Sequence, residues 1–396
     1  MADTSISLEP VGRASRERLF TRQFVLLALA ELAYFTAVGV AVYTLPVFAT
    51  GPVGSGSAGA GLAFGAFAVS ALVLRPLAGR LSDRHGRRPL LAGGALLCAL
   101  GMALTAQVTH LGPLIAVRLL LGVAEAAFFV ATFAALADLA PRSRLGEALS
   151  YNSLGLYLGL ALGPPLGELL VARSGFSAAW HGAAALALLS ALVAVLLGET
   201  HVPEDGDHPP GHLIHWPSVP VALGFLAAVA AMGGYLAFAA LRADQIGMEN
   251  TSLPLFAYGS TVVVCRVAFA RVPDRLPSLP LGAAALAAMA LGLVAIATSP
   301  GAVGLLGGTV LLATGVAFST PAFFTAVFAR ASSEERGAAS ATASIALDLG
   351  LGAGPIALGV VAGALGLGWA FGCAAAVAVA GCGWTVAVHR RARRPR

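Results

Sequence analysis

The sequence of 396 residues has no lysine and few charged residues of any kind, since Asp, Glu and Arg make up only 11% of it. Its 24 basic side chains are all arginine, and the formal net charge is +5. Hydrophobic residues make up 58% of the chain, and the mean hydropathy is +0.85. This composition excludes an ordinary soluble domain and predicts a protein that crosses the lipid bilayer many times. The arginines then belong to loops at the membrane surface, and no nucleic-acid partner is expected.

Cysteine is scarce as well, and Cys98, Cys265, Cys373 and Cys382 all lie in apolar runs. Such cysteines are typical packing residues rather than disulfides or metal ligands. The sequence contains no nucleophile–base pair, nucleotide-binding loop or metal motif. We therefore expect no enzyme activity, no metal, no cofactor, and an energy source other than ATP.

Twelve apolar runs follow one another, each of roughly 19 to 27 residues and long enough to cross a hydrocarbon core about 30 Å thick. The fold class predicted is an all-α membrane protein with 12 transmembrane helices. The runs lie near 24–48, 59–79, 90–109, 112–137, 146–171, 177–198, 218–241, 252–270, 279–298, 302–329, 337–363 and 368–388. They form an N-terminal six-helix bundle (24–198) and a C-terminal one (218–388), with a tail at 1–23, a linker at 199–217 and a basic tail at 389–396.

The arginines predict the orientation of these helices. If the N-terminus is cytoplasmic, the inner loops and tails hold nineteen arginines, whereas the outer loops hold only Arg173 and Arg242. The positive-inside rule therefore predicts that both termini are cytoplasmic and that the protein lies in the cell (plasma or inner) membrane.

The chain also repeats itself at an offset of 191 residues. A constant register over so many helices predicts two parallel, pseudo-symmetric halves related by an axis along the membrane normal. The repeat carries Arg75, Arg80, Asp83 and Arg84 onto Arg266, Arg271, Asp274 and Arg275, and Gly146, Gly159, Gly163 and Pro164 onto Gly337, Gly350, Gly354 and Pro355.

Three motifs resemble a known family. The stretch Arg75–Pro89, RPLAGRLSDRHGRRP, resembles the loop between the second and third helices of major facilitator superfamily (MFS) transporters. The fifth run reads GLYLGLALGPPLG and resembles the fifth-helix signature of the drug/proton antiporter branch, although Ser150 and Glu168 replace glycines of the longer signature. The fourth run adds a pattern similar to R-x-x-x-G-x-x-x-A, formed by Arg118, Gly122 and Ala126.

In the fifth run, Gly155, Gly159 and Gly163 recur every four residues and line one face of the helix, which predicts close packing against another helix. Pro164 and Pro165 predict a bend near the outer half of this run. The residues expected to serve as hinge and packing face are Gly155, Gly159, Gly163, Pro164 and Gly167.

The arginine-rich loop at 79–89, which we call the basic loop, is expected to act as a conformational latch that stabilises the outward-open state. Asp83 could bind the positive end of the helix that starts near Gly337, and Arg87 could reach Asp138. The residues of this latch are Gly79, Asp83, Arg84, Gly86, Arg87, Arg88, Asp138, Arg336, Asp274 and Arg275.

Charges inside apolar spans are costly, so each is a candidate for function or for an ion pair. Glu125, Asp348 and Glu31 are the candidates for proton coupling, and a structural ion-pair role for each stays open. Arg118 precedes Glu125 by two helical turns on the same face and is expected to be its counter-charge. Arg75 and Arg266 are expected to snorkel to the cytoplasmic surface.

Aromatic and polar residues of the spans are candidates for the wall of a central cavity, with ordinary helix packing as the alternative for each. Such a wall suits a lipophilic or cationic organic solute better than a sugar. The candidates are Tyr34, Tyr43, Phe129, Tyr151, Asn152, Tyr157, Tyr235, Phe238, Ser319, Phe323 and Phe324.

The linker ETHVPEDGDHPPGHLIHWP is acidic and rich in proline, and we expect a solvated tether there. Metal binding or pH sensing by His201, His208, His212 and His215 is the alternative, although their spacing matches no compact metal motif.

The sequence thus predicts a secondary active transporter that exports a small organic or drug-like molecule by proton-driven antiport. The protein is expected to be a monomer in the lipid bilayer. Its expected partners are a small-molecule substrate, protons and the bilayer itself. The alternatives are a proton-coupled symporter or uniporter importing a sugar or other polar nutrient, and a non-transporting membrane sensor with the same fold.

Overall fold

The computed structural model describes residues 19–141, 144–200, 214–332 and 335–393. Arg142, Ser150 and Asp274, together with the histidines at 201, 208 and 212, lie outside the described residues or side chains. Within the described ranges every regular element is helical. The first half of the chain forms α1 (Arg22–Thr50), α2 (Gly56–His85), α3 (Arg87–Thr105), α4 (Leu111–Leu139) and α5 (Leu145–Val195).

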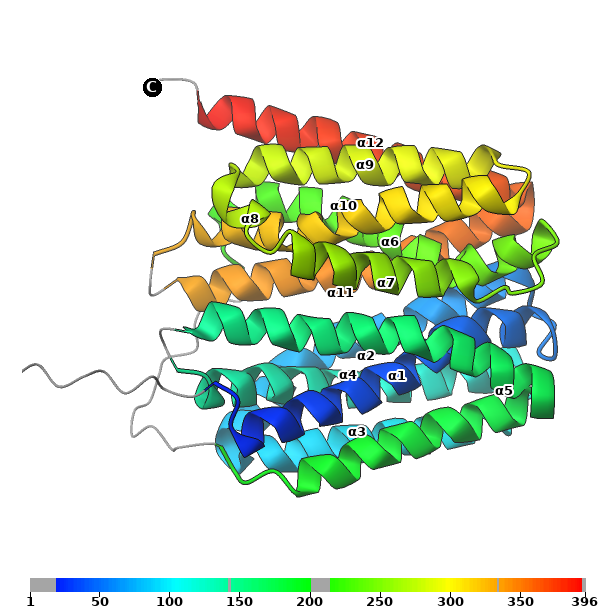
Figure 1. Cartoon of the computed structure of the whole chain (residues 1–396), viewed down its shortest axis with the longest axis horizontal. Helices are drawn as coiled ribbons and strands as arrows, with labels where there is room; N and C mark the ends of the chain where they lie inside the picture. The colour runs from blue at the N-terminus through cyan, green and yellow to red at the C-terminus, as the bar shows by residue number, and fades with distance from the viewer. Residues whose placement is uncertain (1–18, 142–143, 201–213, 333–334, 394–396) are drawn as a thin grey trace, which may run out of the picture.

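The element α5 is a hairpin of two membrane-length helices, which accounts for the fifth and sixth apolar runs. The backbone turns at Gly175, whose φ of 79° is a conformation that a residue with a Cβ rarely adopts. Figure 1 shows its two arms meeting at one end of the molecule. Pro164 and Pro165 lie inside the first arm, where the helix continues. The main break is therefore ten residues beyond the prolines that the sequence singles out.

The second half has the same number of spans. It begins with the short 3-10 turn η2 (Trp216–Ser218) and continues through α6 (Val219–Gln245), α7 (Leu253–Ala268), α8 (Val272–Arg275), α9 (Ser278–Thr298), α10 (Ala302–Phe328), α11 (Arg336–Leu365) and α12 (Leu367–Ala392). With α5 counted twice and the four-residue α8 left out, the described residues contain the twelve predicted spans. Helix α7 is shorter than its apolar run, because the chain turns at Phe269 before α8.

The helices form two bundles that meet along α2 and α11 and along α5 and α7 (Figure 1). In the first bundle, Gly159 and Gly163 of α5 lie against the backbone of α1 at Thr36 and Gly39, as the glycine face predicts. In the second, Gly354 of α11 lies against Ala230 of α6 in the equivalent way. Glycine is required there, because a Cβ at Gly163 would overlap the α1 backbone at 2.5 Å.

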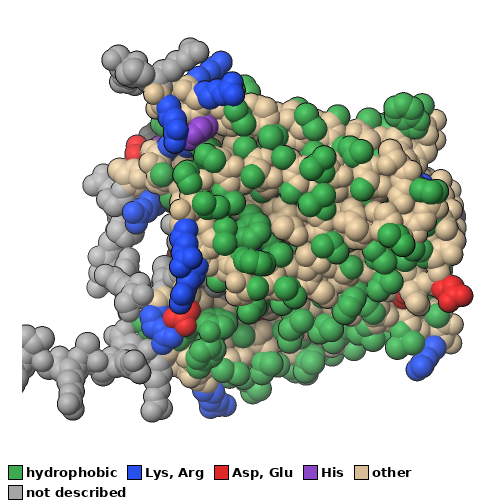
Figure 2. Space-filling view, turned by 45° about the horizontal axis from the view of Figure 1, so that its top comes forward, with side chains coloured by type: hydrophobic (Ala, Val, Ile, Leu, Met, Phe, Trp, Pro, Cys, Tyr) green, Lys and Arg blue, Asp and Glu red, His purple; other side chains and the backbone are tan. Residues whose placement is uncertain are grey.

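The surface divides into an apolar belt and a basic end. Figure 2 shows hydrophobic side chains along the sides of the bundles and arginines gathered at one end. That end, which we call the arginine-rich end, carries the loop after α2 and the last turn of α12, with Arg84, Arg88, Arg390 and Arg391. The other end, where α1 meets α2 and α6 meets α7, is called the opposite end. This distribution fits helices that cross a bilayer.

Candidate functional site

A buried charge cluster joins the two bundles. Arg75 of α2 binds Asp348 of α11 through Nε at 2.5 Å and Nη2 at 2.8 Å, and its Nη2 binds Glu125 of α4 at 3.0 Å. The guanidinium also lies 4.4 Å from the centre of the Phe129 ring. The Arg75 and Glu125 side chains are 11% and 17% exposed, and that of Asp348 is 2% exposed. One arginine thus holds two carboxylates from opposite bundles, and we call these three residues the Arg75 cluster.

The counter-charge of Glu125 is therefore Arg75, and the predicted pairing of Glu125 with Arg118 is wrong. Arg118 donates instead to the backbone carbonyls of Ala63 and Phe64 on α2, at 2.9 and 3.4 Å, and lies over the Phe67 ring. Its role in the structure is to tie α4 to α2. The expectation that Arg75 snorkels to the membrane surface is also wrong, because its guanidinium is buried between the bundles.

Arg266 of α7 also points between the bundles rather than to the surface. Its Nη1 donates to Ser153 Oγ of α5 at 3.0 Å, and its guanidinium lies 4.8 Å from the centre of the Tyr157 ring. Its Nε is buried and has no hydrogen-bond partner among the described residues. Both arginines that the repeat relates therefore contact the other bundle.

Glu31 of α1 lies in a separate place, between α1 and α5. It is 1% exposed, and its Oε1 accepts a hydrogen bond from Asn152 Nδ2 at 2.8 Å. Its Oε2 is buried and, within the part of the chain that is described, has no partner. Oε2 lies 3.6 Å from where a Cβ of Gly155 would stand. Glu31 is thus a buried carboxylate inside one bundle, and within the described part of the chain it forms no hydrogen bond or ion pair with the Arg75 cluster.

Glu168 of α5 makes a second connection between the bundles, at the opposite end. Its Oε1 accepts from the backbone N–H and hydroxyl of Thr251, at 2.6 and 2.8 Å. Its Oε2 accepts from the N–H and hydroxyl of Ser252, the N-cap of α7, at 3.2 and 2.5 Å. Tyr43 of α1 joins this group through Thr251 Oγ1 at 2.9 Å. A carboxylate at a helix N-terminus is well placed for the helix dipole, and here Glu168 links α5 of one bundle to the start of α7 in the other.

The basic loop has one of the two contacts that the latch hypothesis requires. Arg87 Nε binds Asp138 at 3.1 Å, whereas Asp83 is 72% exposed and binds Arg87 at 2.8 Å instead of reaching α11. Glu199, at the start of the linker, accepts from the backbone N–H groups of Arg87 and Arg88. Around this core, Gly79 faces open space, Gly86 has a φ of 94° between α2 and α3, and Arg84, Arg275 and Arg336 are exposed.

The cavity candidates fall into two groups. Phe129, Asn152, Tyr157 and Tyr43 contact the charged or polar groups described above, and Phe238 lies 3.2 Å from the Cβ position of Gly61 across the bundle interface. The others pack mainly inside a bundle: Tyr34 stacks on Phe128, Phe323 and Phe324 contact Phe225, Tyr235 donates to Pro254 O, Ser319 donates to Val316 O, and Tyr151 contacts Phe20.

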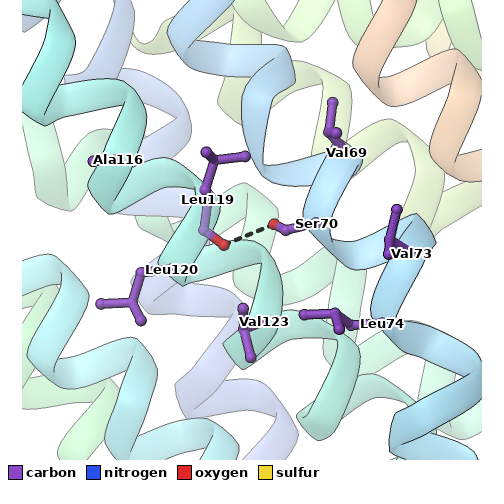
Figure 3. Close-up of a pocket in the computed structure, with 8 residues that line it drawn as sticks. All are labelled: Val69, Ser70, Val73, Leu74, Ala116, Leu119, Leu120 and Val123. Atoms are coloured by element: carbon purple, nitrogen blue, oxygen red, sulfur yellow. Dashed lines mark hydrogen bonds between the residues drawn. The ribbon is translucent and has the colours of Figure 1, made fainter.

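A hollow of about 480 Å³ lies away from these charges, between α2 and α4 (Figure 3). Val69, Val73 and Leu120 are among its apolar lining residues, and Ser70 Oγ donates to Leu119 O at 2.7 Å. Val73 is 68% exposed, so the hollow opens to the outside of the bundle. It belongs to the belt that faces lipid rather than to the candidate site.

The end of the linker is fixed rather than free. The backbone N–H of His215 donates to Thr342 Oγ1 at 2.8 Å, and Nδ1 contacts Ser218 Oγ at 2.8 Å. Its Nε2 lies 3.8 Å from Glu335, whose pKa is lowered by hydrogen bonds from the Ser332 N–H and hydroxyl. Among the described residues, His, Cys, Asp and Glu form no group of three that could hold a metal ion.

Comparison with known proteins agrees with this architecture. The family model of the Major Facilitator Superfamily matches residues 27–355, so the chain belongs to this family of transporters. It is thus an integral membrane protein and a secondary transporter. The substrates of this family are small molecules. The membrane-length helices and the two-bundle fold predicted from the sequence are confirmed.

Relatives share much of the chain. An uncharacterized MFS-type transporter of Salmonella typhimurium (STM4428) is 27% identical over 353 residues, covering 84% of this chain and 88% of the relative. The uncharacterized MFS-type transporter PA1993 of Pseudomonas aeruginosa is 29% identical over 398 residues, 98% of each chain. Multidrug resistance protein 2 of Bacillus subtilis is 30% identical over 174 residues, 44% of this chain and 43% of that protein.

Two solved structures show the same fold. A bacterial homolog of the human lysosomal transporter Spinster, in an inward-facing and occupied conformation, aligns with a TM-score of 0.76 at 16% identity, covering 93% of this chain and 97% of that one. The human organic anion transporter MFSD10 (TETRAN) aligns with a TM-score of 0.72 at 19% identity, covering 94% and 100%.

Proposed function

We propose that this transporter exports a small organic molecule in exchange for protons, by alternating access. The observation that carries the proposal is the Arg75 cluster, in which the guanidinium of Arg75 is shared between Glu125 and Asp348. Because Asp348 belongs to the other bundle, the Arg75–Asp348 pair can persist only while α2 and α11 stay together. A proton that neutralises either carboxylate weakens its bond to Arg75, so proton binding changes how strongly the bundles are held.

The cluster is also a place where protonation is chemically favoured over an uncompensated charge. One guanidinium and two ionised carboxylates leave a formal charge of −1, and a single proton makes the cluster neutral. In surroundings this dry, an unbalanced charge is costly, and breaking a buried pair typically costs about 3–5 kcal/mol. Glu125 is our candidate for the coupling proton, with Asp348 as the second acid and Glu31 as a further, separate carboxylate.

The contacts between the bundles suggest which side is closed. Glu168 and Tyr43 bind Thr251 and Ser252 at the opposite end, whereas Asp83 has no bond to α11 at the arginine-rich end. With the arginine-rich end in the cytoplasm, as the positive-inside rule implies, this is an inward-facing arrangement. The Spinster homolog with the same fold was solved in an inward-facing conformation.

Two observations bear on the direction of transport. Export is supported by the glycine face of α5, which resembles that of drug/proton antiporters, and by the partial similarity to Multidrug resistance protein 2. Proton-coupled symport would use the same Arg75 cluster, and a non-transporting sensor would retain the fold without flux.

Flux into inverted membrane vesicles tests the proposal. Fluorescent organic solutes should accumulate in vesicles with an acidic lumen, and the Glu125→Gln variant should lose this accumulation. Glu147→Gln is the matched control, because Glu147 is an exposed carboxylate that pairs with Arg144 three residues away. Leakage down a solute gradient without response to pH would identify a uniporter, and no flux of any solute would favour the sensor. Unchanged accumulation in Glu125→Gln would refute the assignment of the coupling proton.

A further inference from the structure

The two interfaces between the bundles are equivalent under the 191-residue repeat. Where α2 meets α11, Ala68 lies 3.2 Å from the Cβ position of Gly352. Where α5 meets α7, Gly259 lies against Ala161, and these residues are the repeat partners of Ala68 and Gly352. The register is therefore the same at both interfaces.

This register identifies what has changed around the second arginine. Arg75 and Arg266 are repeat partners, and so are Asp348 and Tyr157. The ion pair of Arg75 with Asp348 thus corresponds to the stacking of Arg266 on Tyr157. Helix α10, which occupies in the second bundle the place of α4 in the first, has no acidic residue to replace Glu125.

Arg266 consequently carries a charge that the described residues do not balance. It forms no ion pair with them, and its polar contact is the neutral hydroxyl of Ser153. Its Nε is buried and unpartnered. Because arginine stays protonated in proteins, this charge cannot be relieved by losing a proton. Arg266 is only partly buried, but an unpaired cation whose Nε donor is buried and unused is still costly unless something binds it.

We propose that Arg266, Ser153 and Tyr157 bind the anionic group of an organic solute: a carboxylate, sulfonate or phosphate. The inference rests on the proposed function, since it names the class of molecule that the transporter carries. Tyr157 covers one face of the guanidinium, Nη1 donates to Ser153, and Nε has no partner among the described residues. An oxyanion that reaches this edge would accept two parallel bonds from the guanidinium. The aromatic ring offers the apolar part of the same solute a surface. A cationic solute, which the aromatic candidates favour at the level of sequence, would be repelled by Arg266.

A pair of dyes with similar ring systems and opposite charge tests the site. Fluorescein is anionic and rhodamine 6G is cationic, and fluorescence anisotropy measures their binding to the purified full-length protein in detergent without a pH gradient. Wild-type protein should bind fluorescein more tightly than rhodamine 6G. Arg266→Gln should weaken fluorescein binding by about tenfold or more, as expected for a charge-assisted bidentate contact.

Two further variants sharpen the test. Tyr157→Asp gives Arg266 the carboxylate that Arg75 already has, and it should weaken fluorescein binding about as much as Arg266→Gln does. Arg173→Gln is the control, since it removes an exposed arginine of α5 outside the site and should leave both affinities unchanged. Each variant must give a monodisperse size-exclusion peak. If Arg266→Gln or Tyr157→Asp fails to fold, Arg266→Lys takes its place. This variant keeps the positive charge but loses the two parallel N–H donors of the guanidinium, so it should bind fluorescein with intermediate affinity.

The inference is overturned if wild-type protein does not bind fluorescein, if it prefers rhodamine 6G, or if the Arg266 variants bind fluorescein as wild type does. The proposed function fails separately. Loss of pH-driven flux with Arg266-dependent binding intact would refute proton coupling alone, and pH-driven flux with binding independent of Arg266 would refute the anion site alone.

Discussion

Replacing Glu168 by Gln should open the transporter at the opposite end. The carboxylate accepts four hydrogen bonds from Thr251 and Ser252, two from backbone N–H groups at the start of α7 and two from hydroxyls. Glutamine keeps one carbonyl oxygen as an acceptor, but its NH2 group would face the donors of the other residue. At least one charge-assisted bond and the attraction to the helix dipole are lost.

The magnitude follows from these losses. Hydrogen bonds to charged groups contribute roughly 1.5–3 kcal/mol each, and a half-buried site belongs nearer the lower figure. Because the contact joins the two bundles, it stabilises only the state in which this end is closed. At about 1.4 kcal/mol for each factor of ten, Glu168→Gln should raise the ratio of open to closed molecules by about 10- to 150-fold.

Double electron–electron resonance can measure this shift without substrate. Spin labels at Ser174 and Asn250, both exposed and on different bundles at the opposite end, report the separation of α5 from the loop before α7. Glu168→Gln should add a population at longer distance. Glu147→Gln should not, because Glu147 lies on the same helix at the arginine-rich end. Distance distributions that coincide in Glu168→Gln and wild type would refute the idea that Glu168 holds this end closed.

Two other substitutions test the helix packing and the latch. Gly159→Leu should insert into the membrane normally but transport poorly, since its Cβ would lie 2.7 Å from the α1 backbone at Thr36. Gly372→Leu is the control, because no atom lies within 4 Å of its Cβ position. Normal flux in Gly159→Leu would contradict the packing argument. Asp83→Asn should increase labelling of single cysteines in the cytoplasmic cavity if Asp83 binds α11 in the outward-open state, and labelling equal to wild type would exclude the latch.

The repeat in the sequence predicted much of the architecture, because glycine spacing and helix register are local properties. The Gly159 and Gly163 face packs as expected, and the equivalence of Arg75 and Arg266 holds at both interfaces. What the repeat does not contain is the direction in which each long side chain points. In the apolar runs read from the sequence both arginines lie near a cytoplasmic end and could reach the membrane surface, so their contacts with the other bundle follow only from the position of that bundle.

The partners of the charged residues were harder to predict for the same reason. Arg118 and Glu125 share a helix face, yet Arg118 reaches backbone carbonyls of α2, and Glu125 finds its arginine on a different turn of that helix. Glu168 stood out in the sequence only as a departure from a glycine motif. Its partners, Thr251 and Ser252, lie more than 80 residues away in the other bundle, and no periodicity connects them.

The charges of the two arginine sites give the exchange a dependence on voltage. If one proton enters through the Arg75 cluster while one monovalent anion leaves from Arg266, two positive charge equivalents move inward in each cycle. Each charge gains roughly 2.3 kcal/mol per 100 mV of membrane potential, so the cycle gains about 4.6 kcal/mol per 100 mV, inside negative. Exchange of a proton for a monovalent cation, or symport of a proton with a monovalent anion, moves no net charge.

Voltage therefore separates these mechanisms where a pH gradient alone cannot. In proteoliposomes at an equal, mildly acidic pH on both sides, where fluorescein is mainly a monoanion, a potassium gradient with valinomycin imposes the potential without a proton gradient. Fluorescein should then move out of the negative compartment faster through wild-type protein than through Glu125→Gln, because only the wild type couples its exit to a proton. Protein-free liposomes correct for passive movement of the dye. Flux through wild-type protein that ignores the potential but follows pH would refute anion–proton exchange and would assign the same two sites to symport.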